Sequence, residues 1–229
     1  MSEKLNPNFL LTNPVTGAYL SLLEPRKFKG KDGKESGEPK YGATFIFAAD
    51  NPDLNGIKKL AMAVAKAEWP NRDIISDLKS RQFKFPFGSG DAQIQKAKKK
   101  ASDKGNEYDG KLDFLADKTT LKSSSKYQPQ LAIFENGKIL DLEGELIKVH
   151  GRKFYSGTLC LGEINFKSYN GVGENPDGVT AYLQSFVSLN RGDRLGGGTS
   201  TAEKFKGYAG KISDIDPTDG ADLDDDIPF

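Results

Sequence analysis

The sequence predicts a mainly β protein, a small Greek-key barrel that carries an inserted helix and long loops. Two observations lead to this fold class. About five to seven short stretches have the composition and alternation of strands, whereas only one long stretch repeats its apolar residues at helical spacing. Polar segments rich in Gly, Ser and Lys separate these stretches, as connections between barrel strands do. The 229 residues suffice for one domain with a sizeable core.

The first part of the chain is expected to hold strands and the main helix. Residues 8–23 look extended, and a charged, Gly-containing loop follows at 29–39. Residues 41–48 are the clearest strand, because two phenylalanines alternate on one face. An amphipathic helix then runs to about residue 68, and Asp50 or Asn51 can cap its start.

The middle of the chain is expected to leave the core and return to it. Residues 72–80 suggest a short second helix, after which Phe83, Phe85 and Phe87 alternate with other residues. Residues 88–110 are polar and strongly basic, which favours a partly helical excursion outside the core. Its lysines either border a binding site for a polyanion or form a solvated surface, and the sequence leaves both interpretations open.

The remaining strands are predicted from alternation and turn residues. Residues 114–125 form one candidate strand, and Asn136-Gly137 predicts a hairpin over 131–140, since this pair adopts the positive φ angles of a tight turn. Further strands are expected at 145–150, 157–169 and 179–189. We therefore predict a folded domain at 1–195, a flexible Gly-containing linker at 196–212 and an acidic tail at 213–229.

The charge is distributed very unevenly along the chain. The tail contains seven aspartates and no Lys or Arg, so residues 1–212 carry 33 basic against 25 acidic residues, a balance of +8. A polyanionic tail can occupy a basic groove, and a nucleic acid would have to displace it because like charges compete for one positive surface. The apolar tip, Ile227-Pro228-Phe229, ends in a carboxylate and suits an apolar pocket with a cation at its edge.

Little in the sequence indicates catalysis, a cofactor or a metal. One His and one Cys, His150 and Cys160, cannot build a His/Cys metal site, and Cys160 lies in an apolar run that predicts a core position. Residues 105–111 imitate a phosphate-binding loop, but Leu112 stands where that motif needs a hydroxyl. We expect no enzyme activity and no cofactor. The single Cys and the lack of a signal or membrane-spanning stretch favour a cytoplasmic protein that does not contact membranes.

Basic residues next to aromatic residues are the strongest signal in the body of the chain. A single strand of nucleic acid exposes phosphates and base faces, so its binder needs Lys or Arg along a track and flat rings for stacking. Such residues recur at four places on strands and strand ends. The predicted contacts are Lys40, Tyr41, Lys118, Lys122, Lys126, Tyr127, Arg152, Lys153, Tyr155, Lys167, Tyr169 and Arg191.

The C-terminal Asp224-Asp225-Asp226-Ile227-Pro228-Phe229 resembles the tip of bacterial single-stranded DNA-binding proteins, which recruit replication and repair enzymes through it. The body resembles the podophage-type single-stranded DNA-binding proteins of phages, at residues 37–52 and 155–189. This resemblance implies an OB-fold variant, a base-stacking role for Tyr169 and a phosphate contact for Lys40. It also implies roles in phage replication and recombination, including strand annealing. Podophage members end in a longer acidic tail, whereas this tail is similar to the bacterial one.

The sequence thus predicts a non-enzymatic, sequence-nonspecific single-stranded DNA-binding protein of phage replication, recombination and repair. Its tail would compete with DNA and recruit partner enzymes when DNA displaces it. Two alternatives remain, an adaptor of the replication machinery that does not bind DNA, and a nuclease. The sequence does not fix the oligomeric state, for which a homodimer is one candidate.

Overall fold

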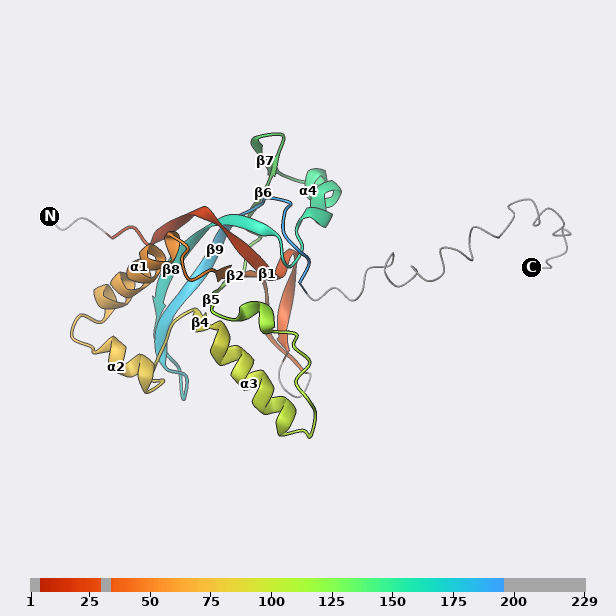
Figure 1. Ribbon diagram of the computed structural model, residues 1–229. Coiled ribbons are helices and arrows are strands. Elements are labelled where there is room, and N and C mark those ends of the chain that lie inside the picture. The colour runs from red at the N-terminus through yellow and green to blue at the C-terminus, as the bar shows by residue number, and fades with distance from the viewer. Residues whose placement is uncertain (1–4, 30–33, 196–229) are drawn as a thin grey trace, which may run out of the picture. The chain divides into compact units, whose positions relative to one another are not determined.

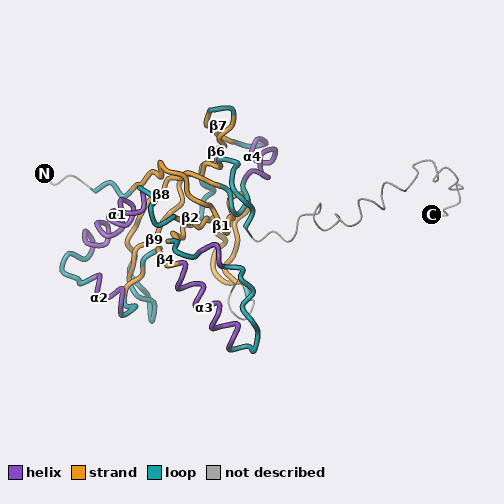
Figure 2. The backbone as a smooth tube through the Cα atoms, viewed as in Figure 1, coloured by secondary structure: helices purple, strands orange, loops and turns teal. Residues whose placement is uncertain are grey.

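The computed structural model describes residues 5–29 and 34–195, which belong to one compact unit spanning Met1–Leu195. The predicted linker and acidic tail lie outside the described residues. Within the described part, strands dominate and gather in the middle of the unit, with the helices around them (Figure 2). The prediction of a mainly β fold with an inserted helix and long loops is confirmed.

In residues 5–29 and 34–195, nine strands form one sheet. They are β1 (Asn8–Lys29), β2 (Glu35–Phe47), β3 (Phe83–Lys84), β4 (Phe87–Ser89), β5 (Thr119–Ser125), β6 (Gln130–Glu135), β7 (Lys138–Leu142), β8 (Leu159–Tyr169) and β9 (Asp177–Ser188). The hydrogen-bonded order is β4-β5-β2-β1-β8-β9-β6-β7, and β3 pairs with β9. The segment β5-β2-β1-β8-β9 within it has the order of a five-stranded Greek-key barrel.

The hydrogen bonds leave this barrel open between β5 and β9. The chain itself spans the opening, because β6 follows β5 after four residues, 126–129, and pairs in parallel with β9. β5 pairs with β2 on its other side, from Tyr41↔Ser125 to Phe47↔Thr119. The end of β5 and the start of β6 therefore hold the two sides of the sheet close together.

Alternating side chains of these strands fill the interior. Phe45, Leu121, Ile164, Leu183 and Phe186 are each at most 1% exposed. Cys160 is also fully buried, and its Sγ lies 3.4 Å from the Val15 carbonyl oxygen, so its predicted core position is confirmed.

Helices α1 (Asp53–Glu68) and α2 (Ile74–Lys79) follow β2, and α1 lies along β8 (Figure 1). Helix α1 begins at Asp53 with Pro52 as its N-cap residue, and Asn51, one of the two predicted caps, lies just before it with its Oδ1 accepting a hydrogen bond from the Asp53 N–H at 3.0 Å. The Asp53 carboxylate in turn accepts the backbone N–H groups of Thr12 and Asn13, both at 2.8 Å, which fixes α1 to β1.

Helix α3 (Gly90–Ser102) extends away from the sheet beside β4 (Figure 1), as predicted for the basic segment. Its hydroxyl cap is Ser89, which accepts from the Ala92 N–H at 3.3 Å. Ile94 packs with Leu115 of the 3-10 turn Asp113–Leu115, whereas the lysines of α3 are exposed.

Three local predictions were wrong. Residues 145–150 form helix α4 (Glu145–His150), followed by a 3-10 turn at Gly151–Lys153, because a six-residue apolar pattern cannot distinguish the two periods. The candidate strand at 114–125 begins only at Thr119, after Asp117 adopts a φ of 56°. The expected loop at 29–39 is shorter, since Arg26 pairs with Lys40 in an extended β1–β2 ladder. The Asn136-Gly137 hairpin is confirmed, with φ angles of 51° and 76°.

Candidate nucleic-acid interface

The sheet has an outward face where β5 and β9 approach each other. Along β5, Leu121 and Ser123 are buried, so Lys122 and Ser124 point outward. Along β9, Val179, Ala181 and Leu183 are buried, which turns Thr180 and Tyr182 to the outside. The burial of the core therefore decides which side chains of these two strands meet on the surface.

Two hollows lie on this face, with volumes of about 460 Å³ and 310 Å³. They share Ser124 and Thr180, so we treat them as one groove and call it the β5–β9 groove. The first hollow is lined by Tyr19, Gly42, Ala43, Thr44, Lys84, Phe85, Pro86, Lys122, Ser123, Ser124, Tyr169, Val179 and Thr180. The second is lined by Lys40, Ser124, Ser125, Lys126, Tyr127, Gln128, Pro129, Lys167, Thr180, Tyr182, Leu183 and Gln184.

Among the described residues, five lysines and no carboxylate line the β5–β9 groove. They are Lys84 and Lys122 in the first hollow, and Lys40, Lys126 and Lys167 in the second. Lys126 forms an exposed ion pair with Glu38, and this hydrogen bond raises the pKa of Lys126 and lowers the pKa of Glu38. Such a pair contributes little to stability and exchanges readily, so a phosphate can replace Glu38 as the partner of Lys126.

Aromatic rings are interleaved with these lysines. Tyr127 is 82% exposed, and the Tyr182 ring lies under the Lys167 ammonium, with 5.2 Å between Nζ and the ring centroid. Tyr19 sits at a register shift of β1 with a φ of 51° and is 59% exposed. A bulge of this kind re-aims a side chain, which accounts for a large apolar ring on the surface. Phe85 and Tyr169 complete the set.

Tyr169 occupies a tightly packed corner of the first hollow. It pairs with Gly178 of β9, and a Cβ placed on Gly178 would lie 2.7 Å from the Tyr169 hydroxyl oxygen and 2.5 Å from the Lys84 carbonyl oxygen. Only a glycine leaves room for the ring there. Burial raises the pKa of Tyr169, and the Asp177 carboxylate raises it further, so the phenol stays neutral and keeps its proton for hydrogen bonding.

The groove brings together half of the predicted contacts, taken from three of the four places in the sequence. Lys40, Lys122, Lys126, Tyr127, Lys167 and Tyr169 all line it. Tyr41 is half-buried and shares its face of β2 with Phe45 and Phe47, which point inward. It therefore lies beside the groove without lining it.

The other predicted contacts lie elsewhere. Lys118 lines a separate hollow near Phe114 and Asp193. Lys153 pairs with Glu135 at 2.9 Å, and its carbonyl oxygen accepts from the Ser188 hydroxyl at 2.6 Å, so it is tied into the fold. Tyr155 donates to the Gly192 carbonyl oxygen at 2.9 Å and carries the Arg194 guanidinium 4.4 Å above its ring.

Arg152 and Arg191 are exposed outside the groove lining, in the Gly151–Lys153 turn and after β9. The structure does not gather them with the six groove residues. They remain predictions, for contacts beyond the groove.

Of the lysines and aromatic residues that line the groove, sequence reasoning missed four: Tyr19, Lys84, Phe85 and Tyr182. Tyr182 had a usable signal, because it lies between buried positions of an alternating strand. Lys84 and Phe85 reach the groove only because β3 pairs in parallel with β9, through Phe83↔Asp177 and Lys84↔Gly178. A contact between segments so distant in the sequence leaves no local pattern.

Residues 5–29 and 34–195 contain no group of three or more His, Cys, Asp or Glu side chains arranged to hold a metal ion. In the same described part of the chain, no helix is both long and apolar enough to cross a membrane.

Comparison with known proteins gives a consistent result. A family model described as the ssDNA-binding protein of Enterobacter phage Enc34 matches residues 9–216. The structure of the bacteriophage Enc34 single-stranded DNA-binding protein in complex with ssDNA is similar, with a TM-score of 0.56 at 16% identity over 85% of this chain and 100% of that chain. A second structure of that protein gives 0.54 at 14% identity, over 88% and 94% of the two chains.

The single-stranded DNA-binding protein gp2.5 of bacteriophage T7 gives a TM-score of 0.47 at 11% identity, over 92% and 95% of the two chains. No curated protein sequence matches significantly. The similarity to the Enc34 structures shows that the fold described above is shared with them.

Proposed function

This chain belongs to the phage single-stranded DNA-binding family represented by the protein of Enterobacter phage Enc34, and we propose that it binds single-stranded DNA along the β5–β9 groove. The observation that carries the proposal is the lining of that groove. Five lysines and five aromatic rings line one outward face, and no carboxylate of the described residues is among the lining.

The chemistry of these side chains fits a strand whose bases are unpaired. Lysines along the groove follow the phosphates, and each ring offers a flat face on which a base stacks for about 1–3 kcal/mol. Every base has such a face, so binding of this kind is tolerant of sequence. A duplex hides its base faces, and the tyrosines of the groove would then have nothing to stack on.

In this proposal the acidic tail competes with DNA for the basic surface of the body and recruits partner enzymes. Its aspartates, among them Asp224, Asp225 and Asp226, would occupy basic surface of the body when no DNA is bound. DNA would displace the tail and free Ile227, Pro228 and Phe229 to recruit partner enzymes. The supporting observation is the charge of residues 1–212, 33 basic against 25 acidic, which an acidic tail complements.

The proposal assigns the protein to DNA replication, recombination and repair during phage infection, including strand annealing. In all of these processes single strands are exposed and must be kept from pairing prematurely or being degraded. The role is that of a binding protein, and the chemistry belongs to the enzymes that it recruits.

Binding of labelled oligo-dT tests the proposal, with the full chain compared with a version that ends at Ile212. That version retains the whole compact unit Met1–Leu195. We expect tight binding that weakens with salt, a preference for the single strand over duplex, and tighter binding after truncation because the competing anion is gone. If truncation leaves the affinity unchanged, the groove remains the proposed binding site, but the tail does not compete with DNA for it.

Two outcomes would replace the proposal. Absence of binding by either version at low salt would favour an adaptor that does not contact DNA. Magnesium-dependent degradation of the oligonucleotide would favour a nuclease.

A further inference from the structure

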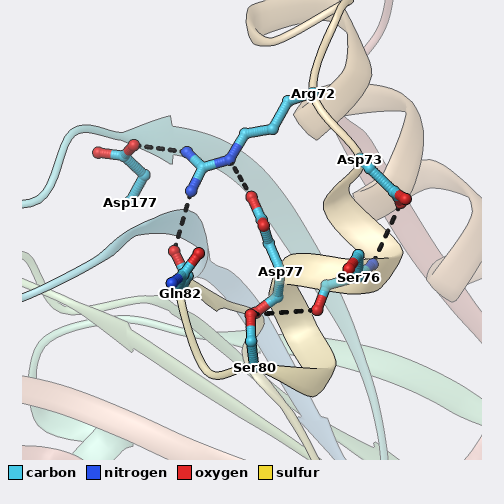
Figure 3. Close-up of polar contacts among 7 residues, drawn as sticks. All are labelled: Arg72, Asp73, Ser76, Asp77, Ser80, Gln82 and Asp177. Carbon is cyan, nitrogen blue, oxygen red and sulfur yellow. Dashed lines mark hydrogen bonds and ion pairs between the residues drawn. The ribbon is translucent and has the colours of Figure 1, made fainter.

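Arg72 bonds to two segments close to it in the sequence, at residues 77 and 82, and to Asp177, which is 105 residues away (Figure 3). Its Nε donates to the Asp77 carboxylate of α2, its Nη1 to Asp177 Oδ2 at 2.6 Å, and its Nη2 to the Gln82 carbonyl oxygen at 3.0 Å. The guanidinium also lies over the Phe83 ring, 5.1 Å from its centroid. Arg72 thus joins α2 to the first residues of β3 and β9.

The Asp177 carboxylate uses both of its oxygens. Oδ2 accepts from Arg72, whereas Oδ1 accepts the backbone N–H of Gly171 at 2.7 Å. The second bond closes the segment between β8 and β9 just after Tyr169. The Gly171 N–H and the Arg72 guanidinium both lower the pKa of Asp177, as expected for a carboxylate that is held by two donors.

These contacts adjoin one wall of the β5–β9 groove. Asp177 pairs with Phe83, and the next residue pair is Lys84↔Gly178. Gly178 in turn pairs with Tyr169, so closely that no Cβ would fit between the Tyr169 ring and the Lys84 carbonyl oxygen. Any movement of β3 against β9 therefore changes the positions of Tyr169 and Lys84 in the groove.

The strand that Arg72 holds is weak by itself. β3 has two residues, Phe83 and Lys84, and depends on its single parallel pairing with β9. A guanidinium offers several donors in a fixed plane, so it can bond three acceptors at once, which a lysine ammonium on its flexible stem does not reproduce. The side chains of Arg72, Asp77 and Asp177 are 25%, 21% and 31% exposed, hence partly shielded from water.

We propose that Arg72 is a positioning residue of the DNA groove, which through Asp177 and Gln82 fixes Tyr169 and Lys84 for contact with a single strand. This inference rests on the proposed DNA binding and deepens it. Arg72 itself is absent from the lining of the groove, so it acts on the strand only through these neighbours.

The test uses the full chain with Arg72→Gln, Tyr169→Ala and the double substitution, measured by anisotropy of labelled oligo-dT over a series of salt concentrations. Lys79→Gln is the matched control, because it removes one exposed positive charge from α2, the helix that begins two residues after Arg72. The fluorescence of Trp69, the one tryptophan of the chain, reports on β3 since its ring meets Phe83 edge-on at 5.1 Å.

Arg72→Gln should weaken binding roughly three- to tenfold, part of the loss expected when a stacking ring is removed altogether. Lys79→Gln should bind within about twofold of the unmodified chain. The double variant should bind within about twofold of Tyr169→Ala alone, a smaller further loss than Arg72→Gln causes by itself, because residues that act through each other are not additive. The salt slope should fall by less than about 0.7, the value for one full phosphate contact, because Lys84 is displaced and not removed. Trp69 emission should shift in Arg72→Gln.

Three results would overturn the inference. They are binding by Arg72→Gln equal to that of the unmodified chain, losses that multiply in the double variant, and weakened binding by Arg72→Gln without a shift in Trp69 emission. Failure of the unmodified chain to bind would instead refute the proposed function.

If Arg72→Gln does not fold, Asp177→Asn carries the same test, because the amide keeps an acceptor for Gly171 and loses the one for Arg72. If neither variant folds, the cluster serves the stability of the fold, and the positioning role is refuted.

Discussion

Replacing Gly178 by alanine tests whether the corner between β3, β8 and β9 shapes the DNA groove. The new Cβ would lie 2.5 Å from the Lys84 carbonyl oxygen and 2.7 Å from the Tyr169 hydroxyl oxygen. An ordinary contact begins near 3.4 Å, so β3 must retreat by 0.9 Å (3.4 − 2.5) or the β9 backbone must yield by the same amount. The Tyr169 ring must move by 0.7 Å (3.4 − 2.7) as well.

The cost can be estimated from two opposing effects. Overpacking of a fitted site costs about 1–3 kcal/mol, whereas a Gly→Ala change recovers about 0.4–1 kcal/mol from the unfolded chain. A net loss of about 1–2 kcal/mol lowers the melting temperature of a unit of this size by roughly 2–8 °C. Affinity for oligo-dT should fall by about three- to tenfold, because Tyr169 and Lys84 both leave their places in the first hollow.

Thermal unfolding and oligo-dT anisotropy would be measured together, with Gly56→Ala as the control. Gly56 is an exposed residue of α1 outside the groove lining, where a Cβ would meet only the edge of the Phe9 ring at 3.1 Å, a side chain that can turn away. The control should keep full affinity. Unchanged affinity in Gly178→Ala, together with a lowered melting temperature, would refute the link between this corner and the groove.

Further predictions concern single groups. Tyr169→Ala should weaken oligo-dT binding about tenfold, and Tyr169→Phe should bind nearly normally because stacking needs the ring and not the hydroxyl; equal losses would argue against stacking. Lys122→Gln and Lys167→Gln should each reduce the slope of log K against log salt by about 0.7, and an unchanged slope would remove that lysine from the phosphate track. The folded state lowers the pKa of Asp177, so its contribution to stability is present at neutral pH and is lost as the pH falls below about 4. Asp177→Asn should therefore be less stable in denaturant at pH 7 but match the unmodified chain in strong acid. Burial raises the pKa of Cys160, so a thiol reagent at pH 8 should modify it only after unfolding; fast modification of the native chain would contradict its core position.

The sequence predicts elements where a local pattern fixes them. The alternation around Phe45 and the Asn136-Gly137 turn each depend on a few neighbouring residues, and both were confirmed. The segment 145–150 was assigned wrongly because six residues hold too little period to separate helix from strand.

The residues of the candidate site likewise fall into those that a local sequence pattern predicts and those that depend on the folded chain. Lys122 and Lys167 could be predicted because each stands on the outward side of an alternating strand. Tyr19 could not, since its exposure depends on a bulge in β1 with a positive φ at a bulky residue. Arg72 could not either, because its bond to Asp177 joins residues that are 105 positions apart, which only the folded chain brings together.

The position of the groove follows from the register of the core. In β5, Leu121 and Ser123 alternate with Lys122 and Ser124, so a slip of one residue would bury the lysine and expose the leucine. Burial of one leucine side chain is worth about 1.5–3 kcal/mol, and β2, β8 and β9 resist such a slip in the same way. The register of the interior thus decides which lysines and rings stand on the outer face and in what order. A binding face of this kind tolerates exchange of one lysine or one ring with a limited loss, whereas a change that shifts the register of β5 would remove several contacts at once.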